Sequence, residues 1–115
     1  IGYILGAGFD IPHGHTSCIM LPAVMRWNKP VNADRQAMVA AAMGDVAGAA
    51  SDDAADRLDA FIGGLGMPRS LGAVDIGRDH FASIAQQALH TPWVPRNPRP
   101  INGPAEVMEI LDLAA

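Results

Sequence analysis

The sequence predicts an all-α domain, a bundle of about five to six short helices. Half of its 115 residues are apolar, which is far more than a disordered chain carries. Aromatic residues make up only 5%, and β-branched residues are sparse beside alanine, so the core should consist of Ala, Leu, Met and Ile. Such a core suits closely packed helices better than strands. Apolar residues also recur at helical spacing in several stretches.

The N-terminal part should hold a helix end, a loop and a kinked helix. Residues 1–5 are predicted to be the last turn of a helix that glycines end, and 6–12 to be a tight loop. A helix is predicted over 14–28, because its apolar residues fall on one face. These residues are Ile19, Met20, Ala23, Val24 and Trp27. Pro22 should kink this helix, and Lys29-Pro30 should end it.

A second helix is predicted over 33–43, where alanine and methionine are frequent. Asn32 is a suitable cap for its first turn, because an amide oxygen can accept a hydrogen bond from a free backbone N–H. The small residues of 44–50 should form a surface connection. This helix is therefore expected to be separate from the one before it.

The third helix should be capped by Ser51 or Asp52 and closed by Gly66. Its buried face is predicted from spacing as Leu58, Phe61, Ile62 and Leu65.

A fourth helix is expected over 79–89, and a last helix begins at Pro104. The predicted buried face of the fourth is Phe81, Ile84, Ala85 and Ala88, and that of the last is Val107, Ile110, Leu111 and Ala114. Between them, 91–100 contains four prolines and should be an ordered or extended crossing. Trp93 and the residues from Arg96 to Arg99 should pack on the core.

Composition limits the classes of partner. The net charge is −4, and no run of Lys or Arg is present, which argues against nucleic acid or an anionic membrane. No apolar stretch reaches membrane-spanning length. Cys18 is the single cysteine, so an intrachain disulfide is impossible and a cytoplasmic location fits. The chain is one domain at most. It begins at Ile1 rather than Met, and we expect it to be a piece of a longer protein.

His13 is the main candidate for chemistry. It follows Pro12 in a glycine-rich stretch at a predicted helix start, which would present an imidazole as a metal ligand or an acid–base group. The commoner role is a histidine that caps a helix or bonds a carbonyl. His15 should lie on another face of the helix and not share an ion with His13. Asp10 could orient His13, although an aspartate in a turn is the commoner case.

The other reactive side chains have ordinary structural interpretations. Cys18 and the methionines should fill the core. His80 should be solvated, and His90 should lie at a helix end. No nucleotide-phosphate loop is present.

The sequence resembles the iron-containing alcohol dehydrogenase family, which includes maleylacetate reductases. The specific part is Leu-Gly-Ala-Gly-Phe-Asp-Ile-Pro-His-Gly at 5–14, followed by Ile-Met-Leu-Pro at 19–22 and by Asn28. Supporting matches are Leu-Gly-Met-Pro at 65–68 and Asn-Pro-Arg-Pro at 97–100. The resemblance covers the whole chain in order.

The resemblance implies a two-domain architecture, dehydroquinate synthase-like, in which an N-terminal α/β domain binds NAD or NADP. The chain at 1–115 would be part of the C-terminal helical domain. That domain holds Fe²⁺ or Zn²⁺ through one Asp and three His, of which only His13 maps here. Many members have a further histidine ten residues before it, close to nicotinamide and substrate, and Tyr3 occupies that position here. Tyr3 is therefore a candidate catalytic residue.

The implied function is hydride transfer between NAD(P) and an alcohol or carbonyl substrate, with a divalent metal as Lewis acid. The fragment alone should be inactive. One alternative is a maleylacetate reductase-type enzyme that acts on an enoate or keto acid. Another is a non-catalytic helical interaction module, which the amphipathic helices would also suit. The substrate, the choice between NAD and NADP, and a homo-oligomeric state stay open.

Overall fold

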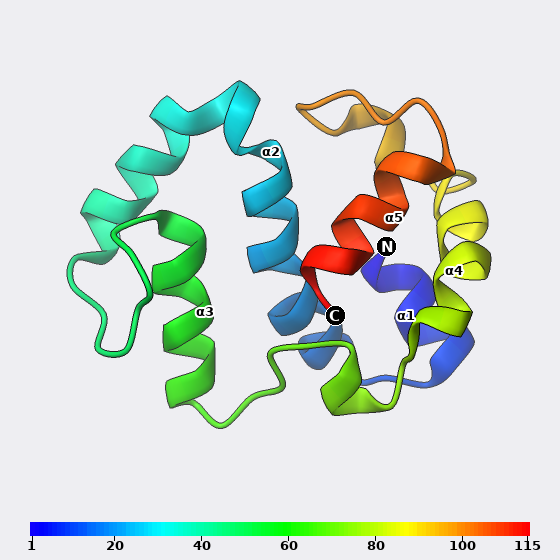
Figure 1. Cartoon of the computed structure of the whole chain (residues 1–115), viewed down its shortest axis with the longest axis horizontal. Helices are drawn as coiled ribbons and strands as arrows, with labels where there is room; N and C mark the ends of the chain where they lie inside the picture. Colours follow the sequence, from blue (N-terminus) through cyan, green and yellow to red (C-terminus); the bar gives the residue numbers. More distant parts are fainter.

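Five α-helices and three short 3₁₀ helices make up the computed structural model, which describes residues 1–115 and contains no β-strand (Figure 1). The all-α prediction is confirmed. The α-helices are α1 (Gly2–Phe9), α2 (His13–Met43), α3 (Ala54–Gly64), α4 (Phe81–Ala88) and α5 (Pro104–Leu113). The 3₁₀ helices are η1 (Gly72–Val74), η2 (Arg78–His80) and η3 (Val94–Arg96). None of these helices combines the length and the hydropathy that a membrane span requires.

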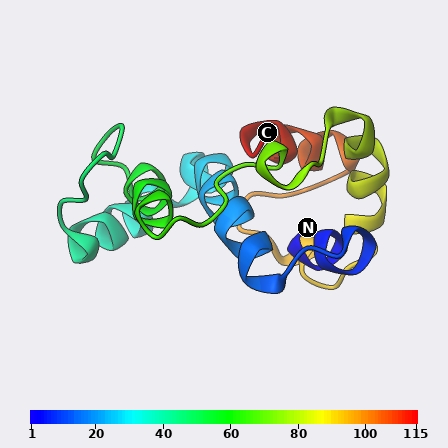
Figure 2. The same ribbon diagram turned by 90° about the horizontal axis from the view of Figure 1, so that it is seen from below.

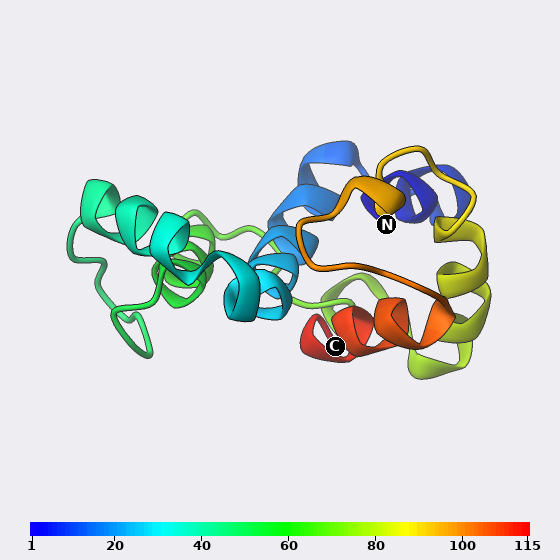
Figure 3. The ribbon, with the colours of Figure 1, turned by 90° about the horizontal axis from the view of Figure 1, so that it is seen from above.

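The core lies between α1, the first half of α2, α4 and α5. Its buried cluster includes Leu5, Ile19, Phe81, Ile84 and Leu111. The second half of α2 and α3 project to one side as a hairpin, which Figures 2 and 3 show from below and above. Trp27 joins α2 to α5, since its indole Nε1 donates to Glu109 Oε2 over 2.9 Å. The start of α2 is therefore anchored in the core, and its end is not.

The predicted loop over 6–12 is wrong for its first half. Gly6 and Gly8 lie inside α1, and the helix ends at Asp10, which has a left-handed φ of 57°. Glycine costs about 1 kcal/mol relative to alanine in a helix. Here Ile4 and Leu5 bury their side chains in the core, and α1 packs against α2 and α4. This tertiary packing outweighs the local preference of two glycines.

The two helices predicted on either side of Lys29-Pro30 form one element with a break. Backbone dihedrals stay helical through Pro22, where we expected the kink, and the single non-helical residue is Asn32 (φ −137°, ψ 30°). The Asn32 side chain does not cap the backbone, because its Oδ1 accepts from Gln36 Nε2 at 2.8 Å. The break coincides with the point where α2 leaves the core for α3.

The predicted buried face of α3 is wrong for Phe61 and Leu65, whereas Ile62 is buried as predicted and Leu58 is half-buried. Phe61 is 51% exposed and Leu65 is 62% exposed, and the N-cap of α3 is Asp53 rather than Ser51 or Asp52. Its buried residues are Ala54, Ala55, Ala60 and Ile62. The reason is that α3 packs against the alanine-rich end of α2 and not against the main core, so small side chains form the contact. The stop at Gly66 is confirmed, with a φ of 71°.

The last two helices agree with the sequence prediction. Every residue expected on the inner face of α4 is at most 2% exposed, and every residue expected on the inner face of the last helix is at most 3% exposed. Pro104 is the first residue of α5, and the Gly103 N–H donates to Glu106 Oε2 at 3.1 Å. Each of these helices packs one face against a single core, so its buried residues recur at helical spacing in the sequence.

Asp56 of α3 gives a pH-dependent contact with α2. Hydrogen bonds from Ser51 and then Arg26 lower the pKa of Asp56 below its usual 3.8. A lowered pKa stabilises the fold above the unfolded-state pKa, and this stabilisation is lost as the pH falls through the folded-state value. We expect Asp56→Asn to cost less than about 1 kcal/mol at neutral pH, because the pair is partly solvated.

This cost should vanish in acid. Urea unfolding of both forms at pH 7 and at a series of lower pH values measures it, since the difference should shrink as the pH falls through the folded-state pKa of Asp56. A difference that stays the same across the series would contradict the ion-pair interpretation.

Candidate functional site

His13 is the first residue of α2. Pro12 precedes it in an extended conformation (φ −52°, ψ 135°), so the chain enters the helix through a stiff residue. The imidazole is exposed and forms no hydrogen bond within the chain, whereas the His13 carbonyl accepts from Thr16 Oγ1 at 2.7 Å. The backbone therefore fixes the residue and leaves the ring free for a ligand. Its role as a metal ligand stays a prediction.

The neighbours of His13 do not complete a metal site. No group of three or more His, Cys, Asp or Glu side chains in this chain is arranged to hold an ion. His15 is half-buried, and Asp10 is exposed at the end of α1. A single free imidazole fits a metal whose other ligands come from residues outside this chain, because each neutral histidine supplies one nitrogen.

The remaining reactive residues lie apart from any cluster. His80 is exposed, with its ring edge against Phe9 at 5.1 Å between centroids. His90 is exposed just beyond α4, and Cys18 is half-buried. None of these side chains extends the candidate site.

Tyr3 lies on α1 and is 60% exposed. Its ring centroid is 5.7 Å from that of Trp93, at an interplanar angle of 54°. The prediction that Trp93 packs on the core is therefore wrong, because the indole is 57% exposed. Sequence reasoning missed this pair. A tryptophan in a proline-rich crossing was the available signal.

The crossing packs on the core through Asn97 and Arg99 instead. The side-chain amides of Asn97 and Asn28 exchange two hydrogen bonds, of 3.1 and 2.6 Å. The Arg99 guanidinium lies 4.0 Å from the centre of the Trp27 ring and donates to the Trp27 carbonyl oxygen at 2.9 Å. The prediction that the crossing packs on the core is therefore confirmed for Asn97 and Arg99. The Asn-Pro-Arg-Pro segment is thus a clamp on α2 that fixes the residues before it.

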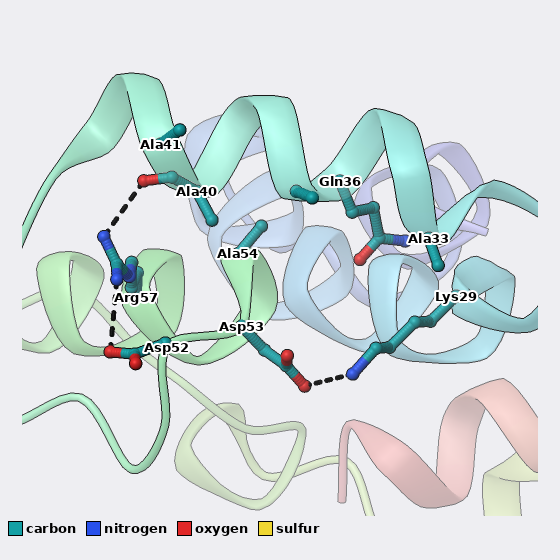
Figure 4. Close-up of a pocket in the computed structure, with 10 residues that line it drawn as sticks. Lys29, Ala33, Gln36, Ala40, Ala41, Asp52, Asp53, Ala54 and Arg57 are labelled. Carbon is teal, nitrogen blue, oxygen red and sulfur yellow. Dashed lines mark hydrogen bonds and ion pairs between the residues drawn. The ribbon is translucent and has the colours of Figure 1, made fainter.

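A pocket of about 380 Å³ lies between the second half of α2 and α3 (Figure 4). Its charged side chains are already paired. Lys29 Nζ is 2.5 Å from Asp53 Oδ2, and Arg57 donates to the Ala40 carbonyl and to Asp52. None of the candidate catalytic residues lines it, so we assign it to the joint of the hairpin.

Comparison with known proteins decides the family. The model of the Fe-containing alcohol dehydrogenase family, C-terminal, matches residues 1–115. The chain belongs to the iron-containing alcohol dehydrogenase family. The resemblance stated from residues 5–14 and the later motifs is confirmed.

Curated relatives of this iron-containing alcohol dehydrogenase chain are oxidoreductases by name. A maleylacetate reductase of Rhizobium sp. is 33% identical over 82% of this chain and 25% of the relative. A 1,3-propanediol dehydrogenase of Klebsiella pneumoniae is 32% identical over 86% and 28%. A lactaldehyde reductase of Escherichia coli is 31% identical over 83% and 26%. The chain thus spans about a quarter of these relatives. No solved structure matches it significantly.

Proposed function

We propose that the full-length protein is an oxidoreductase that transfers hydride between NAD(P) and a small alcohol or carbonyl substrate. The observation that supports this most is the match of the family model to every residue of the chain. The relatives named as reductases and dehydrogenases agree with it. The relatives favour an enzyme over an interaction module. The exposed Phe61 and Leu65 of α3 are the remaining support for such a module.

In this proposal the chain supplies one wall of the active site. A bound Fe²⁺ or Zn²⁺ supplies Lewis-acid polarisation of the substrate oxygen, and NAD or NADP carries the hydride. His13 contributes one ligand nitrogen from the fixed head of α2. The Tyr3 hydroxyl, exposed on α1, hydrogen-bonds the substrate oxygen or passes a proton to it. The other ligands and the cofactor domain belong to residues outside this chain.

A maleylacetate reductase-type activity is the second candidate. Two of the relatives carry that name, at 33% and 31% identity. The two candidates differ in substrate, since one reduces or oxidises an alcohol–carbonyl pair and the other acts on a keto acid. In both candidates His13 is the proposed metal ligand and the Tyr3 hydroxyl contacts the substrate oxygen.

The decisive experiment uses the full-length, metal-loaded protein. We expect about one divalent metal per chain, because the resemblance implies a single site with four protein ligands. We also expect NAD(P)H-linked turnover of short alcohols and aldehydes or of maleylacetate, measured by nicotinamide absorbance. The chain of residues 1–115 alone should show none. A metal-loaded protein that turns over none of these substrates with either cofactor would contradict the proposal.

A further inference from the structure

Tyr3 and Trp93 form an aromatic pair that faces solvent. Both residues are more than half exposed, although the centroids of their rings lie only 5.7 Å apart. Burial of large apolar side chains stabilises a fold, and this pair forgoes much of that stabilisation. Neighbouring exposed aromatic side chains indicate a binding surface more often than isolated ones do.

Trp93 is exposed but held in place. Figure 3 shows the proline-rich crossing, gold to orange, beside the start of α1. On one side of Trp93, Thr91 is buried and its Oγ1 donates to the Ala88 carbonyl at 2.7 Å. On the other side, Val94 is buried and Asn97 is locked to Asn28. The indole is therefore presented by a fixed backbone, which is the requirement for a side chain that orients another group.

Trp93 also lines an apolar pocket of about 170 Å³. The other walls include Gly2 at the start of α1 and Met20 and Val24 on α2. Asn97 is the single polar side chain among the lining residues, and no charged side chain lines the pocket. A short hydrocarbon chain matches this lining, whereas a hydroxylated or carboxylated group would lose hydrogen bonds to water there.

We propose that Trp93 is a positioning and specificity residue for the oxidoreductase reaction. Its indole holds the Tyr3 ring where the phenol reaches the substrate oxygen, and it forms the wall that accepts the apolar carbon chain of a primary alcohol or aldehyde. The inference rests on the proposed function. It adds a substrate class, since it favours carbon chains longer than that of ethanol and without further polar groups.

The test compares ethanol and 1-butanol as substrates of the full-length, metal-loaded enzyme. Trp93→Ala should raise the KM for 1-butanol about tenfold and that for ethanol less than about threefold, because each buried methylene contributes about 0.8 kcal/mol. It should also lower kcat about tenfold for both, since the phenol is no longer held. Trp93→Phe should stay within about threefold of the unsubstituted enzyme, because a ring is kept.

A double-mutant cycle separates positioning from packing. In a Tyr3→Phe background the ring remains but the hydroxyl is gone, so adding Trp93→Ala should change kcat less than about twofold. Phe61→Ala, another exposed aromatic, is the matched control and should leave both constants unchanged. If the unsubstituted enzyme turns over 1-butanol but Trp93→Ala behaves like Phe61→Ala, the inference is overturned and the proposed function stands. If the unsubstituted enzyme turns over neither alcohol, the inference is overturned, and the proposed function is overturned as well only if aldehydes and maleylacetate are not turned over either.

Discussion

Replacing His13 with alanine in the full-length protein is expected to remove the bound metal and to lower kcat/KM at least about 100-fold. Loss of a residue that merely supports a ligand costs 10–100-fold, and His13 is proposed as a ligand itself. The structure gives no reason for a folding defect, because the imidazole is exposed and bonds to nothing in the chain. Elemental analysis of the purified variant, with turnover measured in parallel, checks both parts.

His15→Ala is the control for this substitution. His15 lies two residues along the same helix, so it tests whether any histidine near the head of α2 would give the same result. We expect that variant to keep its metal. Full metal content in His13→Ala would remove His13 from the ligand set. Loss of activity with unchanged metal, in an enzyme that resists chelators, would instead assign His13 to acid–base chemistry.

The elements that the sequence predicted well are those that bury one stripe against one core. The helical spacing of apolar residues directly predicts the inner faces of α4 and α5. The predictions for α1 and α3 failed because local signals lost to tertiary contacts. Two glycines suggested a loop, yet Leu5 is fully buried in a helix. The apolar stripe of α3 suggested burial, yet its partner is an alanine-rich helix that small residues approach more closely.

The candidate site likewise contains local features, which the sequence predicts, and non-local contacts, which it does not. The place of His13 at the start of α2 follows from a proline and a helix start, which are local features that the sequence contains. The contact of Tyr3 with Trp93 joins the two ends of the chain, and no periodicity relates them. The amide pair of Asn28 and Asn97 is equally non-local. A metal centre needs ligands from several segments, and in our proposal this chain supplies one of them, His13.

Phe81→Ala should be the most destabilising of these substitutions in the fold itself. Phe81 is 2% exposed at the start of α4 and belongs to the cluster that joins α1, α2, α4 and α5. Truncating a buried phenylalanine costs about 3–5 kcal/mol, through lost burial and the cavity that remains. Domains of this size have about 5–15 kcal/mol in total, so the variant should be close to its stability limit. Urea unfolding of the chain, followed by helical circular dichroism, measures the loss.

Phe61→Ala gives the matched comparison, because the same atoms are removed from a residue that is 51% exposed on α3. Its cost should stay within about 0.5 kcal/mol. Spacing alone places Phe61 and Phe81 on equivalent buried faces and therefore predicts similar losses for both. The structure predicts a difference of several kcal/mol, since only Phe81 reaches the shared core. Similar losses would mean that α3 packs through its large apolar face, and that the alanine contact with α2 is wrong.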